Sequence, residues 1–291
     1  MKPTDFGNFV EKQDWLAPVE NTLEAVADAT LKPAGQGVRN FLHGTWLGHP
    51  LHPAISDFPI GAWSTAAILD LVDLFNDEER YAEAADLAVN VGIVSAVGVA
   101  AAGLCDWQKI GEGPARRAGA LHALFNSSAL LCYIASWLQR RSGNREAGVA
   151  TGLAGYALVF AGAWIGGHLS YAERIGVDHA QRGGPDTWTA VLPEGDLPES
   201  QPRKVSAHGV DIMLVKRDGK IFAIGEKCAH LRGPLSEGKL EENSIVCPWH
   251  GSQFSLETGE VLNGPAVYGQ PCFEVRTAGG QIEIRVRRNE R

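Results

Sequence analysis

Three long segments without charged side chains follow one another in the first half of the chain, and they restrict its fold more than any other feature. Residues 87–105, 118–138 and 147–169 contain no Asp, Glu, Lys or Arg. Each segment has roughly the 20 residues that a helix needs to cross about 30 Å of hydrocarbon. Helices on the surface of a soluble bundle need a polar face, so the three segments predict membrane-spanning helices.

A fourth segment, residues 54–75, has a similar length but carries Asp57 near one end and Asp70 and Asp73 near the other. We expect it to span as well, with these carboxylates at the membrane interface. Glycines spaced four residues apart in the last span allow helix backbones to approach closely. The predicted spans are residues 54–75, 85–105, 118–138 and 147–169, and the spaced glycines are Gly148, Gly152, Gly162 and Gly166.

The distribution of Lys and Arg around the predicted spans indicates their orientation in the membrane. Four spans put both chain ends on one side, and Lys and Arg near the span ends are more numerous on that side, which favours the cytoplasm. We therefore expect a multi-pass protein of the cell inner (plasma) membrane with its C-terminal domain in the cytoplasm. The net charge of −8 argues against nucleic acid as a partner, because binding phosphates needs a basic face.

The polar C-terminal part carries a metal-ligand pattern. Cys228-x-His230 is followed, after sixteen residues, by Cys247-x-x-His250. Two sulfurs and two imidazoles can hold a tetrahedral zinc ion. Zinc fingers with these ligands, however, run Cys-Cys and then His-His, with a helix carrying the histidines. Here each loop brings one Cys and one His, among short predicted strands and Gly-rich turns, so a zinc site is the less favoured interpretation.

Residues 187–286 resemble a Rieske [2Fe–2S] domain of the ferredoxin type. The resemblance implies that Cys228 and Cys247 bind the buried iron and that His230 and His250 bind the outer iron. Replacing two Cys ligands by two His ligands raises the reduction potential above that of a plant-type ferredoxin. The resemblance also implies a surrounding shell of four residues, the last of them in the proline loop "TGEVLNGPA". These residues are Leu231, Trp249, Ser252 and Pro265.

Departures from the quinol-oxidising branch of this family indicate the type of Rieske domain. The extra Cys pair that forms a disulfide there is missing, and Phe254 stands where that branch places a hydrogen-bonding Tyr. Fewer hydrogen bonds to the cluster predict a potential in the lower part of the Rieske range. Oxygenases of this family pair the cluster with a catalytic domain bearing mononuclear iron. We expect no such domain here, so the chain is an electron-transfer component of an oxidoreductase system and not a complete oxygenase.

The stretch "GHPLHPAISDFPIGAW", residues 48–63, resembles the opening of a four-span bacterial membrane domain of undefined function (DUF2231-like) that covers about residues 43–177. His52 precedes the first span, His122 lies early in the third, and His168 ends the fourth. We expect all three at similar depth on the face that carries the Rieske domain. Three interpretations stay open: ligation of a haem b, a quinone pocket, or interfacial hydrogen bonding.

These observations predict a multi-domain chain, in which an all-α four-helix transmembrane bundle precedes an all-β Rieske-type iron–sulfur domain. Its function is predicted to be the exchange of single electrons between the cluster and a membrane cofactor or redox partner, with donor and acceptor unidentified. A passive membrane anchor for a ferredoxin that serves a soluble oxidoreductase, and a redox-sensing interaction protein, are the alternatives. The predicted parts are a polar segment (1–42), the transmembrane domain (43–177), a linker (178–186) and the Rieske domain (187–286).

Overall fold

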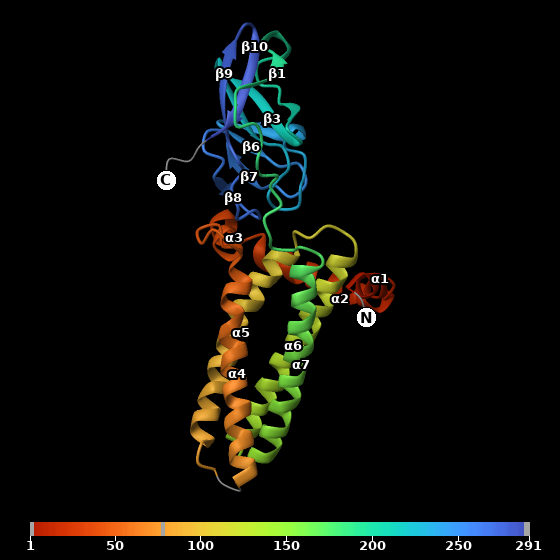
Figure 1. Ribbon diagram of the computed structural model, residues 1–291. Coiled ribbons are helices and arrows are strands. Elements are labelled where there is room, and N and C mark those ends of the chain that lie inside the picture. Colours follow the sequence, from red (N-terminus) through yellow and green to blue (C-terminus); the bar gives the residue numbers. More distant parts are fainter. Residues whose placement is uncertain (1–2, 77–78, 288–291) are drawn as a thin grey trace. The chain divides into compact units, whose positions relative to one another are not determined.

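The computed structural model describes residues 3–76 and 79–287 and confirms the expected fold class. The chain forms two compact units (Figure 1). One contains residues Met1–Gly35 and Leu51–Ile175, and the other contains residues Gln36–Pro50 and Gly176–Arg291. The first unit is helical and the second is built mainly of strands.

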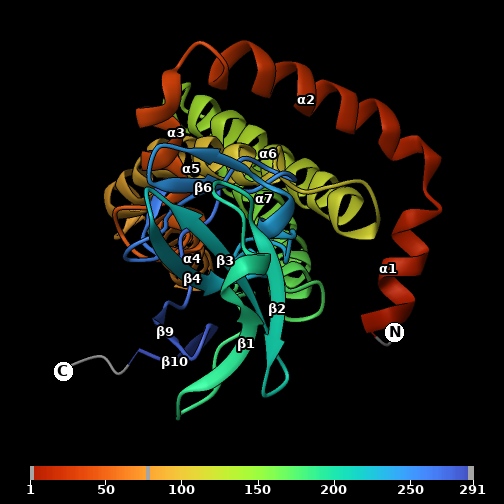
Figure 2. The ribbon, with the colours of Figure 1, turned by 90° about the horizontal axis from the view of Figure 1, so that it is seen from above.

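Four long helices make up the body of the helical unit, and each is long and apolar enough to cross a membrane. They extend beyond the predicted spans at every end, and they pack as two antiparallel hairpins, α4 with α5 and α6 with α7 (Figure 1). Shorter helices, α1 and α2, lie across one end of this bundle, as the view along it shows (Figure 2). The bounds are α1 (Pro3–Glu11), η1 (Asp14–Leu16), α2 (Ala17–Leu31), α4 (Leu51–Asn76), α5 (Ala82–Trp107), α6 (Pro114–Arg141) and α7 (Arg145–Tyr171).

Aromatic rings and glycines fill the middle of the bundle. Trp63 of α4 stacks on Tyr133 of α6, with ring centroids 4.1 Å apart and planes 3° from parallel. A Cβ at Gly92 of α5 would lie 2.1 Å from the indole nitrogen of Trp63, and a Cβ at Gly155 of α7 would lie 3.2 Å from the ring of Tyr133. The glycines therefore make the room that these two large rings occupy.

One charged residue from each long helix joins an ion cluster at one end of the bundle. Arg140 donates to Asp70 (3.0 Å) and to Asp86 (2.8 Å), and Arg145 donates to the same two carboxylates (3.0 and 2.9 Å). The side chains of Asp70 and Arg140 are only 4% and 3% exposed. Asp73 is also buried and accepts from the backbone N–H of Tyr81.

Asp70 and Asp73, which the sequence analysis expects at the membrane interface, are thus buried among neighbouring helices near the end of α4. Two positive and two negative side chains neutralise one another inside the bundle, and a backbone amide satisfies the fifth charge. Charges in an apolar interior are tolerated when they are paired in this way.

Replacing Arg140 by Ala leaves the buried Asp70 carboxylate without its closest partner. We expect Arg140→Ala to lower the free energy of unfolding by about 3–5 kcal/mol. Arg141→Ala is the matched control, because Arg141 is exposed and stacks only on Trp137; its loss should cost less than about 1 kcal/mol. Denaturation by SDS titration from mixed micelles measures both values, and equal losses would show that the ion cluster contributes nothing specific.

The strand unit consists of three antiparallel sheets, with strand orders β1-β10-β9, β2-β3-β4 and β5-β6-β7-β8. Strand β3 is buried on both faces: Ile212 and Leu214 join one core, and Met213 and Val215 join the other, as the two-residue period of a strand requires. The second core supports the loops that carry the metal-ligand pattern. The bounds are β1 (Thr189–Pro193), η2 (Glu194–Asp196), β2 (Arg203–Ala207), β3 (Val210–Arg217), β4 (Lys220–Gly225), η3 (Leu235–Glu237), β5 (Lys239–Glu241), β6 (Ser244–Val246), β7 (Gln253–Ser255), β8 (Val261–Asn263), β9 (Phe273–Ala278) and β10 (Gln281–Val286).

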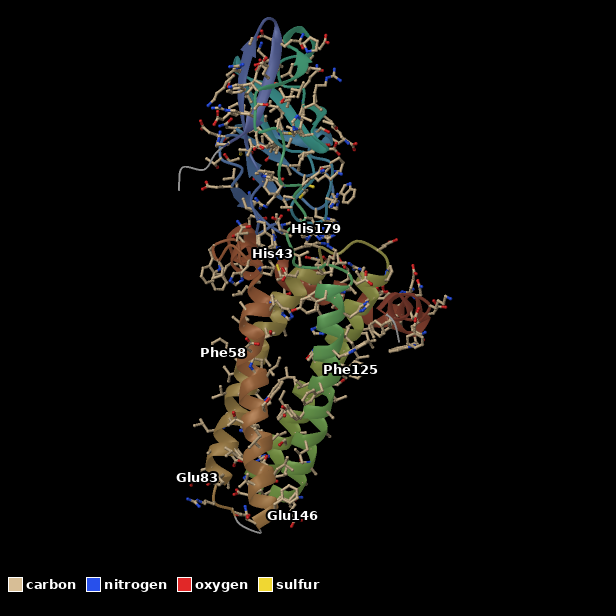
Figure 3. All side chains as sticks on the ribbon, in the orientation of Figure 1. His43, Phe58, Glu83, Phe125, Glu146 and His179 are labelled. Carbon is tan, nitrogen blue, oxygen red and sulfur yellow. The ribbon has the colours of Figure 1, made fainter. Side chains whose placement is uncertain are left out.

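Two segments outside the strands also belong to this unit. The first is Gln36–Pro50, where His43 is labelled in Figure 3, and the second begins at Gly176, where His179 is labelled. The first contains most of helix α3 (Gly35–His43) and the turn after it. Asn40 donates to the side chain of Asn263 (3.0 Å) and accepts from the backbone N–H of Gly264 (3.0 Å). The structure thus groups residues 36–50 with the strands, whereas the sequence analysis divides them between the N-terminal segment and the membrane domain. Single hydrogen bonds of this kind leave no periodic pattern in a sequence.

Asp211 ties strand β3 to the base of the first ligand loop. It accepts from the Ser206 hydroxyl (2.6 Å) and pairs with Lys204 (3.2 Å) and Lys227 (3.3 Å). The hydrogen bond from Ser206, followed by those from the two lysines, lowers the pKa of Asp211 to about 2.

We expect Asp211→Asn to destabilise the strand unit by about 1–2 kcal/mol at pH 7. Because the pKa is lower in the folded state, this stabilisation is present above pH 4 and disappears as the pH falls from about 4 to about 2. Proteolysis in urea, with thermolysin at pH 7 and pepsin near pH 2, measures the difference. Asp218→Asn, which removes the same charge from an exposed turn, should show no such pH dependence; a difference that persists near pH 2 would contradict the assignment.

Candidate metal centre

Two loops with the same backbone geometry present the four candidate ligands. In the first loop the N–H of Cys228 donates to the carbonyl of Gly233 (2.9 Å), and in the second the N–H of Cys247 donates to that of Ser252 (2.8 Å). Each loop turns through a residue with positive φ four positions after its Cys, Arg232 (φ 67) and Gly251 (φ 79). The two loops therefore hold one Cys and one His each in matching positions.

The two thiols lie together below the loops. Cys228 and Cys247 are buried and hydrogen-bond to each other. That bond lowers the pKa of Cys247 to about 7, assisted by the backbone amides of Trp249 and His250, while the same contact and burial raise the pKa of Cys228. Backbone amides of the first loop also face the Cys228 sulfur. Such amide cradles stabilise the thiolate form, which is the form that binds a metal.

The two imidazoles lie together at the loop tips. The Nδ1 atoms of His230 and His250 are 3.2 Å apart, and the ring planes are nearly perpendicular. Two nitrogens that bind one tetrahedral metal at about 2.1 Å lie about 3.4 Å from each other. The separation of the two Nδ1 atoms is thus close to that of two nitrogens on a single metal ion.

The grouping of the four ligands fits a binuclear cluster better than a zinc ion. A Cys₂His₂ zinc ion needs all four at one point, whereas a Rieske cluster takes two thiolates on one iron and two imidazoles on the other. The pairs found here match the second arrangement.

The loops approach each other closely at Gly233. A Cβ there would lie 2.7 Å from the Cys247 sulfur and 3.1 Å from the Trp249 ring. Any other residue at this position would push one loop away from the other. The glycine therefore allows the two loops to lie against each other.

The four surrounding residues predicted from the resemblance occupy different environments. Ser252 is fully buried, and its hydroxyl oxygen accepts from the N–H of Ala266 (3.0 Å). Pro265 is buried and Leu231 is half-buried. Trp249 is 56% exposed and lies beside His250.

Glu226 and Asn40 also position the site, and the sequence analysis missed both. Glu226 is 2% exposed, accepts from the N–H (3.0 Å) and hydroxyl (2.7 Å) of Ser236, and burial raises its pKa. It thereby fixes the two ends of the first loop to each other, while Asn40 holds the proline loop. A signal for Glu226 was available, since an acidic residue directly follows the apolar run "IFAIG"; no such signal exists for Asn40.

The membrane histidines do not all meet. His52 and His122 face each other with ring centroids 6.0 Å apart. His168 instead contacts Glu173 (3.2 Å) and the ring of Phe6 on α1. His52 and His122 thus form a pair, and the ring of His168 lies apart from it, because α1 packs against the His168 side of α7.

Comparison with known proteins gives two family matches in the expected order. Residues 48–179 match the family "Predicted membrane protein (DUF2231)", and residues 187–274 match the Rieske [2Fe–2S] domain. The 3-phenylpropionate/cinnamic acid dioxygenase ferredoxin subunit of Photorhabdus laumondii is 39% identical over 92 residues, which are 31% of this chain and 87% of that protein. The ferredoxin of carbazole 1,9a-dioxygenase from Nocardioides aromaticivorans IC177 matches at 25% identity with a TM-score of 0.34, over 35% of this chain and 99% of that one.

Human apoptosis-inducing factor 3 is 31% identical over 119 residues, which are 40% of this chain but only 20% of the length of that relative. The ferredoxin subunit, in contrast, is matched over nearly its whole length. The chain therefore belongs to the Rieske [2Fe–2S] family, and it carries a membrane domain of the DUF2231 family in front of its ferredoxin-type domain.

Proposed function

We propose that this protein is a membrane-anchored electron carrier whose Rieske cluster exchanges single electrons with a membrane cofactor or a redox partner. The observation that carries the proposal is the pairing of two buried thiols with each other and of two imidazoles at the tips of matching loops. When bound, the [2Fe–2S] cluster supplies a one-electron couple. Cys228 and Cys247 would hold its inner iron, and His230 and His250 its outer iron.

The residues around the ligands divide the site into a dry side and an open side. Phe254 and Leu235 are fully buried next to the two cysteines, so water is kept from the sulfur ligands. His230 and His250 are only partly buried, and the exposed Trp249 lies beside His250. A partner would therefore approach the histidines, where the path for an electron is shortest.

Two kinds of electron route are consistent with this site. The pair His52 and His122 supports exchange with a membrane cofactor, for which haem b and quinone are the candidates. The likeness to dioxygenase ferredoxin subunits favours the alternative, in which the helices anchor a ferredoxin that serves a soluble oxidoreductase. In both cases we place the protein in the inner (plasma) membrane with its Rieske domain in the cytoplasm, on the strength of the Lys and Arg distribution.

We expect Cys228→Ser to abolish the cluster, because one iron loses half of its protein ligands. The measurement is the iron content and the Rieske EPR signal of the dithionite-reduced full chain, together with a one-electron titration of the wild type. Cys272→Ser is the matched control: burial raises the pKa of Cys272, so it stays a neutral thiol and a poor ligand. A cluster that survives Cys228→Ser would refute the ligand assignment.

Ser252→Ala should retain the cluster and lower its potential. The Ser252 oxygen accepts from Ala266, which leaves the hydroxyl hydrogen available to a cluster sulfur. A hydrogen bond of roughly 1–1.5 kcal/mol that favours the reduced state corresponds to a decrease of about 40–60 mV for a one-electron couple. Redox titration followed by EPR measures the change. Ser255→Ala, three residues along in β7, should leave the potential unchanged, and an equal shift in both variants would exclude a specific role for Ser252.

A further inference from the structure

The two helical hairpins of the membrane unit correspond to each other at constant residue offsets. Between α4 and α6 the offset is 70, since 122 − 52, 133 − 63 and 140 − 70 are equal. Between α5 and α7 it is 63, since 146 − 83, 155 − 92, 162 − 99 and 166 − 103 are equal. The matched positions are His52 and His122, Trp63 and Tyr133, Asp70 and Arg140, Glu83 and Glu146, Gly92 and Gly155, Val99 and Gly162, and Gly103 and Gly166.

Matched residues of α4 and α6 contact each other at three levels of the bundle. The histidines meet at one end, with centroids 6.0 Å apart, Trp63 stacks on Tyr133 in the middle, and Asp70 pairs with Arg140 towards the other end. Glu83 and Glu146, which begin the matched helices α5 and α7, lie at one end of the bundle (Figure 3). Contacts between equivalent residues are the property of a two-fold interface, so the hairpins are related by a local pseudo-two-fold axis.

The two histidines have equivalent hydrogen bonds as well as equivalent positions. Nδ1 of His52 lies 3.0 Å from the carbonyl of Val99, and Nδ1 of His122 lies 2.8 Å from the carbonyl of Gly162. A carbonyl only accepts, so each Nδ1 carries the hydrogen and each Nε2 has a free lone pair. The amide nitrogen of Asn126 lies 3.2 Å from Nε2 of His122, as expected for a donor that meets this lone pair.

Matched glycines make room for both rings. A Cβ at Gly103 would lie 2.7 Å from Nδ1 of His52, and a Cβ at Gly166 would lie 3.1 Å from Cε1 of His122. Each imidazole is thus held against the neighbouring helix of its own hairpin by a glycine and a backbone carbonyl. This is the usual support of a metal-binding histidine, whose second nitrogen donates to a carbonyl or carboxylate.

We propose that His52 and His122 are the two axial ligands of one haem, bound through their Nε2 atoms between the two hairpins. This names the membrane cofactor of the proposed function, on which the role in electron transfer rests. Among the residues that the structure describes, no third His, Cys, Asp or Glu joins the pair, so a bare zinc or copper ion would lack ligands. Haem iron brings its four equatorial nitrogens and needs only axial ligands from the protein.

A quinone fits this pair less well. Its carbonyl oxygens need hydrogen-bond donors, whereas both Nε2 atoms are acceptors once Nδ1 carries the hydrogen. Binding of iron requires Asn126 to leave Nε2 of His122. The amide keeps a partner when it does so, because it also donates to the backbone carbonyl of His122 (2.8 Å).

The test is to add haemin to the full chain, purified in detergent, and to record the reduced-minus-oxidised visible spectrum. We expect about one haem per chain with the narrow bands of a six-coordinate, low-spin iron. His52→Ala and His122→Ala should each weaken haem retention by at least about tenfold, and added imidazole should restore the low-spin spectrum. His49→Ala is the matched control, because His49 is exposed and precedes helix α4, outside the matched positions.

Two results would overturn the proposal: a wild-type chain that takes up no haemin, or low-spin spectra that persist in both histidine variants. Failure to recover the spectrum with imidazole would assign the two side chains a structural role only. The Rieske EPR signal, recorded on the same samples, separates these outcomes from a failure of the proposed function. An intact cluster without haem leaves the electron carrier standing, whereas loss of the cluster signal in the wild type would refute the carrier itself.

Discussion

The hydrogen bonds that close the two ligand loops are the interactions on which the metal centre depends. Each loop closes through the amide of its Cys, and each turns through a residue with positive φ. Because the two closures are equivalent, each loop contributes one sulfur and one nitrogen, and the sulfurs and nitrogens form separate pairs. A Rieske cluster takes its protein ligands in pairs of this kind, two sulfurs and two nitrogens. Backbone geometry thus sets the grouping of the four candidate ligands before any side chain around them acts.

The membrane unit also pairs the residues of two equivalent elements, which are helical hairpins in place of loops. Two equivalent hairpins meet along an axis, and residues at equal positions contact each other as a ring pair, an aromatic stack and an ion pair. The difference between Asp70 and Arg140 is informative. An Asp faces an Arg at the level where two equal charges would repel each other, so the two hairpins differ at a position where identical residues would be costly.

Much of this architecture is accessible from the sequence, because it rests on periodic or local signals. Apolar length predicts the four spans, and the Cys-x-His and Cys-x-x-His spacing predicts the cluster ligands. Contacts that depend on tertiary packing have no such signal in the sequence. Nothing near Asp70 indicates that Arg140 neutralises it, nothing near Asn40 indicates its bond to Gly264, and the depth of His168 does not reveal that its ring faces Phe6. The repeat itself escapes detection because most matched positions carry different residues, such as Trp63 and Tyr133, and because the offset of 70 between α4 and α6 differs from the offset of 63 between α5 and α7.

The segment of residues 36–50 shows how chain path and packing differ in this molecule. The chain passes from one unit to the other three times, at residues 35–36, 50–51 and 175–176. Residues 36–50 therefore stand between two helical segments in the sequence but belong to the strand unit. Asn40 fixes the segment there, because it hydrogen-bonds the side chain of Asn263 and the backbone N–H of Gly264 in the proline loop. The proline loop beside the candidate ligands is thus held by a residue more than 220 positions earlier in the chain, and a contact over that separation has no local signal in the sequence.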